Sequence, residues 1–206
     1  MTEEKTQMVD LLKASKQKPT IIKNHSEKGF LVDKKLYKES AAKLKEVEER
    51  NSTLIKNWNK KVKKNDVVFH LGNFAWDPTT ARKVLKKLNG RIFFLKGNAD
   101  KALEEVISEF PKAEFLSDAI MDLLDFDAII CHYPLSVWNG KDSGTVHMHG
   151  HTVFSHKTDL TIENRFNVCT DFWGYTPINY LTLKDSYLKY DEPTDGRDDT
   201  KNSSDN

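Results

Sequence analysis

The stretch IFFLKGNADKAL, residues 92–103, decides how the fold of this chain is interpreted. A short apolar run ends in Lys-Gly-Asn at 96–98, and a helical pattern begins at Lys101. Short apolar runs bounded by turn residues are typical of buried strands. A second stretch, DVVFHLGN at 66–73, has the same form. Both stretches predict a buried strand that places an asparagine at its carboxyl end.

Strand and helix patterns alternate through most of the chain. Apolar positions recur at helical spacing between Ser40 and Lys63. We expect strands at residues 20–22, 66–71, 91–96, 113–116, 119–124, 127–132, 145–150, 165–170 and 179–184, and further helices at 3–18, 79–88 and 101–110. Near-continuous apolar strands that alternate with helices favour an α/β layered fold.

The length of 206 residues allows one substantial hydrophobic core. We expect an N-terminal helical extension at 1–19, an α/β domain at 20–186 and an acidic tail at 187–206. From Tyr190 onward the tail has six acidic and two basic residues and no further large apolar group. Such a composition predicts disorder.

The composition excludes several classes of protein. Thirty-two basic residues nearly balance thirty-one acidic ones, so the net charge of +1 does not indicate nucleic-acid binding. The lysine-rich segment NKKVKKND, residues 59–66, is interpreted as solvated helix ends. The chain has no apolar run of membrane-spanning length and no apolar signal-peptide core, which favours a cytoplasmic protein. Cys131 and Cys169 lie in predicted strands without a CxxC partner, as expected of buried thiols.

Polar residues follow several of the predicted strands directly. These residues are Asn24, His25, Gly72-Asn73, Gly97-Asn98, His132 and His149-Gly150-His151. A single histidine or Gly-Asn turn is more often structural than functional. Five such strand ends, however, meet at one crevice if the strands are parallel, and that crevice is where open α/β sheets build their sites. The pattern therefore predicts a site.

The same residues resemble the motifs of a known family. KNH at 23–25, GN at 72–73, GNAD at 97–100, CH at 131–132 and GHTV at 150–153 stand in the slots of the calcineurin-like metallophosphoesterases, most closely of their short single-domain bacterial and phage members. The flanking segments, such as HYPLSVWNG, are also similar. The resemblance covers the expected domain and implies a metallophosphoesterase-like layered β-sandwich with flanking helices.

Four positions depart from the family motifs. Lys23 and Asn73 replace aspartates, Ala99 replaces the catalytic histidine and Val153 replaces a metal-binding histidine. Paired metal ions in this family clamp the phosphate and activate water. The ammonium group of Lys23 would repel a metal ion, and the lost carboxylates no longer offset its charge. Loss of the catalytic histidine removes general-acid help worth about 10²–10⁴-fold in rate. The resemblance therefore implies that the first metal site is empty and that hydrolysis is lost.

The second metal site keeps more of its ligands. By resemblance these are Asn73, Asn98, His132 and His151. Two imidazoles and neutral oxygens would hold at most one divalent ion, Zn²⁺, Mn²⁺ or Ni²⁺, and only weakly. We expect no other cofactor. A different hypothesis uses a cationic pocket that would bind phosphate or a nucleotide without cleaving it, formed by Lys23, His25, His132 and His151.

The leading functional hypothesis is a pseudoenzyme that acts as a scaffold or inhibitor for an unidentified protein partner. The occurrence of the subfamily in phages extends this hypothesis to a phage-encoded, host-directed role. The alternatives are a weak mononuclear metal-dependent phosphoesterase and a non-catalytic phosphate or nucleotide sensor.

Two further expectations concern residues near the crevice. Asp100 is expected to cap the helix that begins at Lys101. The aromatic residues Phe74, Trp76, Trp138 and Phe154 are candidates for a contact patch, although Trp138 is more simply explained as packing.

Overall fold

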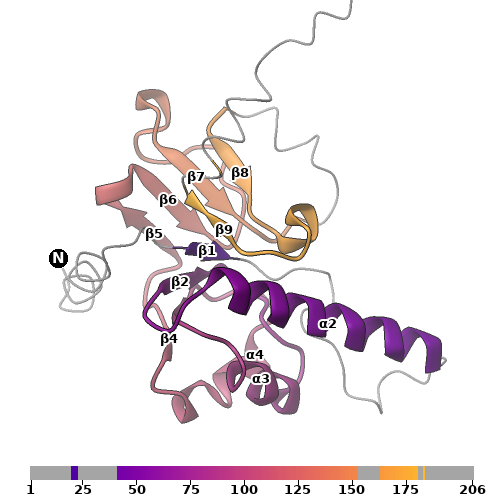
Figure 1. Ribbon diagram of the computed structural model, residues 1–206. Coiled ribbons are helices and arrows are strands. Elements are labelled where there is room, and N and C mark those ends of the chain that lie inside the picture. Colours follow the sequence, from indigo (N-terminus) through magenta and orange to yellow (C-terminus); the bar gives the residue numbers. More distant parts are fainter. Residues whose placement is uncertain (1–19, 23–40, 153–162, 181–182, 184–206) are drawn as a thin grey trace, which may run out of the picture.

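The computed structural model describes residues 20–22, 41–152, 163–180 and 183. In this part of the chain two β-sheets pack against each other, and the helices α2 to α4 lie on the outer side of one of them (Figure 1). The strand orders are β4-β3-β2-β1-β9 and β5-β6-β7-β8. The protein is therefore a mixed α/β protein with parallel strands in both sheets and flanking helices.

The first sheet is built from strand–helix–strand units. Its strands are β1 (Thr20–Ile22), β2 (Val67–His70), β3 (Arg91–Phe94) and β4 (Ala113–Phe115), all parallel, with β9 (Ile178–Asn179) antiparallel to β1. The connections carry α2 (Ala41–Lys61), α3 (Pro78–Leu85) and α4 (Lys101–Glu104). Parallel neighbours need such crossovers, because a tight hairpin cannot join them.

The second sheet is mixed. Its strands are β5 (Ile120–Leu123), antiparallel to β6 (Ala128–Cys131), followed by β7 (Val146–His149) and β8 (Arg165–Asn167) in parallel. Short 3₁₀ helices occur at η1 (Ile107–Glu109), η2 (Leu124–Phe126), η3 (Lys141–Ser143) and η4 (Thr170–Trp173).

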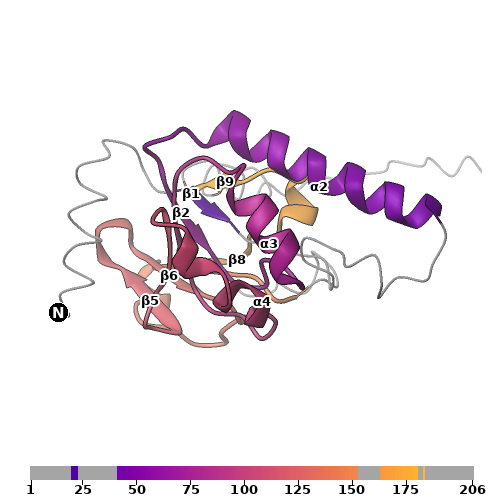
Figure 2. The same ribbon diagram turned by 90° about the horizontal axis from the view of Figure 1, so that it is seen from below.

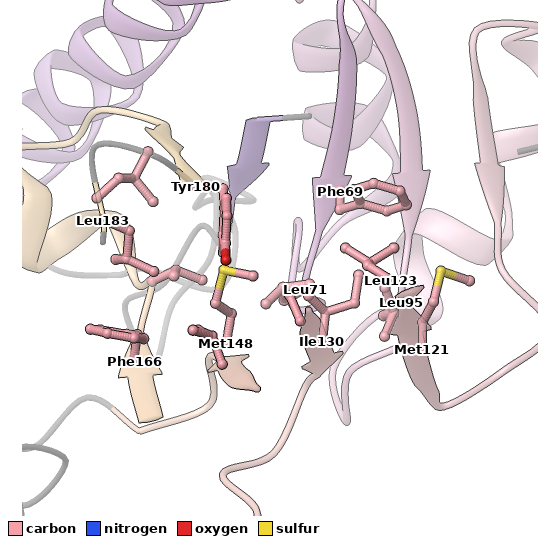
Figure 3. Close-up of a cluster of buried hydrophobic side chains, with 14 of the residues drawn as sticks. Phe69, Leu71, Leu95, Met121, Leu123, Ile130, Met148, Phe166, Tyr180 and Leu183 are labelled. Atoms are coloured by element: carbon pink, nitrogen blue, oxygen red, sulfur yellow. The ribbon is translucent and has the colours of Figure 1, made fainter. Parts of the chain in front are cut away.

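The main core lies between the two sheets (Figure 3). Phe69, Leu71 and Leu95 project from the β2 and β3 segments and are at most 3% exposed, as is Met148 of β7. Leu123 and Ile130 complete this layer from the second sheet. Since alternate residues of a strand face opposite sides, the intervening residues must find a second core.

That second core lies between the first sheet and its helices (Figure 2). Val68 and Ile92 face outward from β2 and β3 and are fully buried with Trp58 of α2, Leu85 of α3 and Leu103 of α4. Burial on both faces explains why the strands read as continuous apolar runs.

Three local predictions were wrong. The helix expected at 101–110 divides into α4 and η1, because the fully buried Val106 adopts a non-helical φ of −124° between them. Among the described residues of the strand expected at 179–184 only Asn179 is extended, since Tyr180 and Leu183 are helical. Cys169 lies beyond the end of β8, where it precedes η4.

The other strands and helices lie close to their expected positions, with ends displaced by one to three residues. The helix expected at 3–18, the extension at 1–19 and the whole tail at 187–206 were sequence expectations that lie outside the described residues. Among the described helices, none combines the length and apolarity needed to cross a membrane.

Candidate functional site

Four of the residues singled out in the sequence come together around one oxygen atom. Asn98 Oδ1 lies 3.2 Å from Asn73 Nδ2, 2.9 Å from His132 Nε2 and 3.2 Å from His151 Nδ1. The asparagines follow β2 and β3 of the first sheet, and the histidines follow β6 and β7 of the second. The site is therefore assembled from the carboxyl ends of strands in both sheets.

The two glycines that precede the asparagines allow this close approach. A Cβ atom on Gly72 would lie 2.5 Å from His132 Nδ1 and 2.6 Å from the backbone nitrogen of Gly97. A Cβ atom on Gly97 would collide with the side chain of Asn73. Gly72 also has a φ of +89°, which favours glycine. The Gly-Asn pairs are thus a steric requirement of the site.

Two of the site residues have left-handed backbones without being glycine. Asn73 has φ of 58° and His151 has φ of 63°. This conformation costs an L-residue about 1–2 kcal/mol, although asparagine tolerates it better than histidine. Strained backbones of this kind concentrate at functional sites, where the surrounding structure holds them in place.

Asp100 has a different role from the one expected. Its side chain makes no cap hydrogen bond to α4. Instead, Oδ2 accepts the backbone N–H groups of Asn73 at 2.8 Å and Gly97 at 2.7 Å, and Oδ1 accepts that of Phe74 at 2.7 Å. The residue is only 1% exposed. The buried Asp100 carboxylate therefore joins the two Gly-Asn loops through hydrogen bonds from their backbone N–H groups.

The hydrogen bonds of His132 determine which of its nitrogens carries the proton. Nδ1 lies 2.7 Å from the carbonyl oxygen of Leu71, and since a carbonyl can only accept, Nδ1 is the donor. In the neutral ring Nε2 then presents a lone pair to Asn98 Oδ1, and it lies 3.2 Å from His151 Nδ1. Asn73 fixes the orientation of Asn98 by donating to the same oxygen.

Asn98 Oδ1, His132 Nε2 and His151 Nδ1 thus face one another within 3.2 Å, and all three present lone pairs when the proton of His151 is on its Nε2. Electron-rich atoms at these distances repel unless a proton or a metal ion lies among them. Ligands about 2.0–2.1 Å from Zn²⁺ in a tetrahedral arrangement are themselves roughly 3.3 Å apart. Asn98, His132 and His151 therefore fit a single cation held by neutral ligands when His151 carries its proton on Nε2, whereas a proton on Nδ1 joins the same three atoms by hydrogen bonds.

The residues present do not fit a pair of metal ions. Asn73 Oδ1 accepts the backbone N–H of Ala99 at 2.9 Å, so this amide oxygen is turned toward the loop. Within the described ranges no three side chains of the types His, Cys, Asp or Glu are grouped to hold a metal ion. Lys23, His25 and Val153 lie outside the described residues.

Tyr133 lies at the rim of the site and was not among the residues predicted from the sequence. Its ring centroid lies 4.7 Å from the rings of both His132 and His151, in edge-to-face contact. Tyr133 is nevertheless 44% exposed. Its position directly after His132 was the only signal in the sequence.

The aromatic contact patch expected from the sequence does not form as a whole. Phe74 and Trp138 are buried and belong to the packing of the fold. Trp76, which follows the Gly72-Asn73 loop, is 52% exposed. Phe154 lies outside the described residues.

A further histidine near the site is structural. His147 Nε2 accepts the backbone N–H of Leu135 at 3.0 Å, and Nδ1 donates to the carbonyl oxygen of Ile129 at 3.2 Å. Burial lowers the pKa of His147 to about 4. The ring is therefore neutral at pH 7 and connects the loop after β6 to the second sheet.

Comparisons with known proteins place the chain among relatives of unknown function. No family model matches it. The structure resembles the crystal structure of AQ665, a protein of unknown function from Aquifex aeolicus, with a TM-score of 0.56 and 19% identity over 82% of this chain and 98% of the other. At that identity the likeness concerns the fold alone.

A sequence relative is closer. The uncharacterized protein MJ1445 from Methanocaldococcus jannaschii is 30% identical over 140 residues, which cover 65% of this chain and 72% of the relative. Identity of this extent reflects common descent. The chain therefore belongs to the same family as MJ1445.

Proposed function

We propose that the protein is a catalytically inactive member of the metallophosphoesterase-like fold that acts by binding a protein partner. The observation that carries this proposal is the pair of hydrogen bonds made by Asn73. By the resemblance this position holds the carboxylate that bridges two metal ions, but here the amide joins Ala99 to Asn98. A neutral group engaged on both sides leaves no charge to balance two cations.

Ala99 supports the same conclusion. By the resemblance this position holds the histidine that assists the leaving group, but a methyl group has no proton to transfer. The backbone N–H of Ala99 is also engaged, because it donates to Asn73. Loss of the acid together with a metal ion removes the two main contributions to phosphoester hydrolysis.

Exposed aromatic side chains in the segments that follow His132 and the Gly72-Asn73 loop favour a protein partner at the candidate site. Tyr133 and Trp76 are 44% and 52% exposed. Tyrosine and tryptophan offer a large contact area with little loss of conformational entropy, and both are enriched in protein interfaces. The partner surface would then be centred on Tyr133.

A second candidate function is a single divalent metal site. The convergence of Asn98 Oδ1, His132 Nε2 and His151 Nδ1 favours it, and the neutral donors suit Zn²⁺ or Ni²⁺. When bound, such an ion supplies a Lewis acid that polarises a phosphoryl oxygen. His132 would bind through Nε2 because Nδ1 donates to Leu71.

Hydrolysis of bis(p-nitrophenyl) phosphate with added Mn²⁺, Ni²⁺ or Zn²⁺ tests the loss of catalysis. We expect no metal-dependent turnover by the natural chain. We expect measurable turnover only after all four family residues are restored in Lys23→Asp/Asn73→Asp/Ala99→His/Val153→His. Metal-dependent turnover by the natural chain that disappears in His132→Ala would refute the proposal and establish a mononuclear hydrolase.

Elemental mass spectrometry after metal loading and desalting tests the second candidate. At most one ion per chain, lost in His132→Ala, is the expected result for the single site. Two ions per chain would contradict the role given to Asn73.

Photo-crosslinking tests the partner surface. A photoreactive amino acid at Tyr133 is expected to capture a specific protein in the native host cell. The same group at Leu124, which is 71% exposed in η2, provides the control and should not capture it. Equal capture at both positions, or at neither, would count against a partner centred on Tyr133.

A further inference from the structure

Side-chain hydrogen bonds join the carboxyl end of α2 to the segment that follows α3. Both segments lie at the amino ends of the strands of the first sheet, away from the candidate site. Asn59 of α2 donates to the carbonyl oxygen of Lys87 at 2.7 Å, just beyond the end of α3. The indole N–H of Trp58 donates to the carbonyl oxygen of Asn89 at 2.9 Å. The side-chain amide of Asn89 donates to the carbonyl oxygen of Val62 at 3.2 Å. The carboxyl ends of α2 and α3 therefore form one surface.

Seven exposed lysines lie on these two helices and the turns that follow them. They are Lys56, Lys60, Lys61, Lys64, Lys83, Lys86 and Lys87, here called the basic end. Within the described residues none of them has a carboxylate at ion-pair distance, since the ion pairs in that part of the chain involve other residues.

Three of the described acidic residues near this surface are already engaged. Asp66 is buried and accepts the backbone N–H of Lys63 at 2.7 Å. Glu109 and Glu114 are paired with Arg82 and Arg91. Among the described residues most lysines of the basic end therefore lack a carboxylate partner, although Glu109 also acts electrostatically on Lys86 and Glu105 lies near Arg82. The whole chain carries a net charge of only +1.

The helix dipoles account for only part of this charge. Lysines near a helix carboxyl end interact favourably with its exposed carbonyl groups. Two other lysines already do so, because Lys63 Nζ donates to the carbonyl of Lys60 and Lys112 Nζ donates to that of Leu88. Within the described residues none of the seven lysines of the basic end makes a side-chain hydrogen bond of this kind.

The basic end is separate from the candidate site. The segments that carry it lead into the amino ends of β2 and β3, whereas Asn73 and Asn98 follow the carboxyl ends of the same two parallel strands. The two surfaces therefore lie at opposite ends of the strands of this sheet. A ligand that binds one surface need not contact the other.

We propose that the basic end binds the phosphate backbone of double-stranded nucleic acid without reading its sequence. Lysine ammonium groups act as point charges toward phosphates. Lys56 and Lys60 lie four residues apart on α2, about 6 Å along its axis, so successive turns present a row of positive charge. Contacts of this kind position a protein on a duplex but carry no sequence information.

The described residues of this surface favour a duplex over a single strand. Binding to single strands relies on exposed aromatic rings that stack with bases. The tryptophan of this region, Trp58, is only 2% exposed. Base reading relies on arginine forks, but Arg82 and Arg91 are engaged with carboxylates.

Fluorescence anisotropy with a labelled 20-base-pair DNA duplex tests this inference on the full chain. If about four lysines contact phosphates, the logarithm of the binding constant should fall with that of the salt concentration with a slope of about −3.6. Between 50 and 200 mM NaCl the affinity should then fall by about 150-fold.

Matched variants locate the binding surface. Lys60→Gln/Lys64→Gln/Lys87→Gln should weaken binding at 50 mM NaCl at least about tenfold and bring the slope close to −1, because each lost phosphate contact removes about 0.9. The control Lys45→Gln/Lys96→Gln/Lys101→Gln removes three exposed lysines elsewhere, of which Lys45 is paired with Glu49 and Lys96 with Glu104, and should bind like the natural chain. Circular dichroism verifies that both variants are folded.

Three results would overturn the inference. The first is an equal loss of binding in the two triple variants, because binding would then follow net charge alone. The second is tighter binding to the single strand than to the duplex. The third is displacement of the duplex by polyglutamate at the same charge concentration, which would point to an acidic protein as the ligand.

Discussion

The carboxylate of Asp100 offers a sharp test of how the candidate site is built. Its three backbone hydrogen bonds join residues 73, 74 and 97 in a position that is 1% exposed. Asp100→Asn keeps the shape of the side chain but replaces one oxygen with an NH₂ group. In the best orientation, the remaining amide oxygen still accepts the backbone N–H groups of Asn73 and Gly97. The NH₂ group then faces the backbone N–H of Phe74.

The expected cost follows from these contacts. One hydrogen bond to a charged group, worth about 1.5–3 kcal/mol, is replaced by two donors that face each other, and the other two bonds lose their charge assistance. We expect the free energy of unfolding to fall by about 3 kcal/mol. In a protein of this size that corresponds to a fall in Tm of roughly 6–12 °C.

Urea unfolding followed by tryptophan fluorescence at pH 7 measures this change. Asp77→Asn is the matched control, because Asp77 is the N-cap of α3 and accepts the backbone N–H of Thr80 at 2.8 Å. Asparagine caps a helix about as well as aspartate, so the control should change stability by less than about 0.5 kcal/mol. A loss below about 1 kcal/mol in Asp100→Asn, or one equal to that of the control, would refute the role assigned to Asp100.

Three other predictions rest on single residues. Gly72→Ala should cost more than about 3 kcal/mol, because the new methyl group collides with His132, whereas Gly144→Ala, with a similar φ of +88° and no atom within 4 Å, should cost about 1 kcal/mol; similar losses in urea unfolding would contradict this. The buried His147 has a pKa of about 4 against 6.5 when exposed, so the unfolded chain binds its proton first as the pH falls. The free energy of unfolding should therefore drop by about 2 kcal/mol between pH 7 and pH 5, and most of this drop should be absent in His147→Gln. Burial raises the pKa of the Cys131 thiol, so Cys131 should react with Ellman's reagent only when the chain is unfolded, and fast reaction in the native protein would exclude its burial.

Local patterns in the sequence were sufficient to predict most strands and helices. Strands buried on both faces must be apolar at successive positions, and β2 and β3 were recognised for that reason. The predictions failed where tertiary packing overrode the local pattern. The buried Val106 interrupts a stretch that was predicted to be helical. The chain becomes helical at Tyr180, after only two residues of β9.

The sequence also indicated which polar residues follow the strands, but it could not assign their contacts. Asp100 looked like a helix cap because it precedes α4, yet two of its three partners lie 26 and 27 residues away in the chain. Tyr133 gave no signal of its own, since its contact with His151 depends on how β6 and β7 are paired. Contacts between distant segments are invisible to any local pattern.

The charge distribution shows the same division. Composition alone determined a nearly neutral chain, and the lysines at 60–64 were interpreted as a solvated helix end. Only the tertiary structure places them beside Lys86 and Lys87, through the hydrogen bonds of Asn59 and Asn89. The sequence determined which residue types the chain offers and at what spacing along each element. The folded structure decided which of them meet, because electrostatic and steric interactions depend on distance in space and not on distance along the chain.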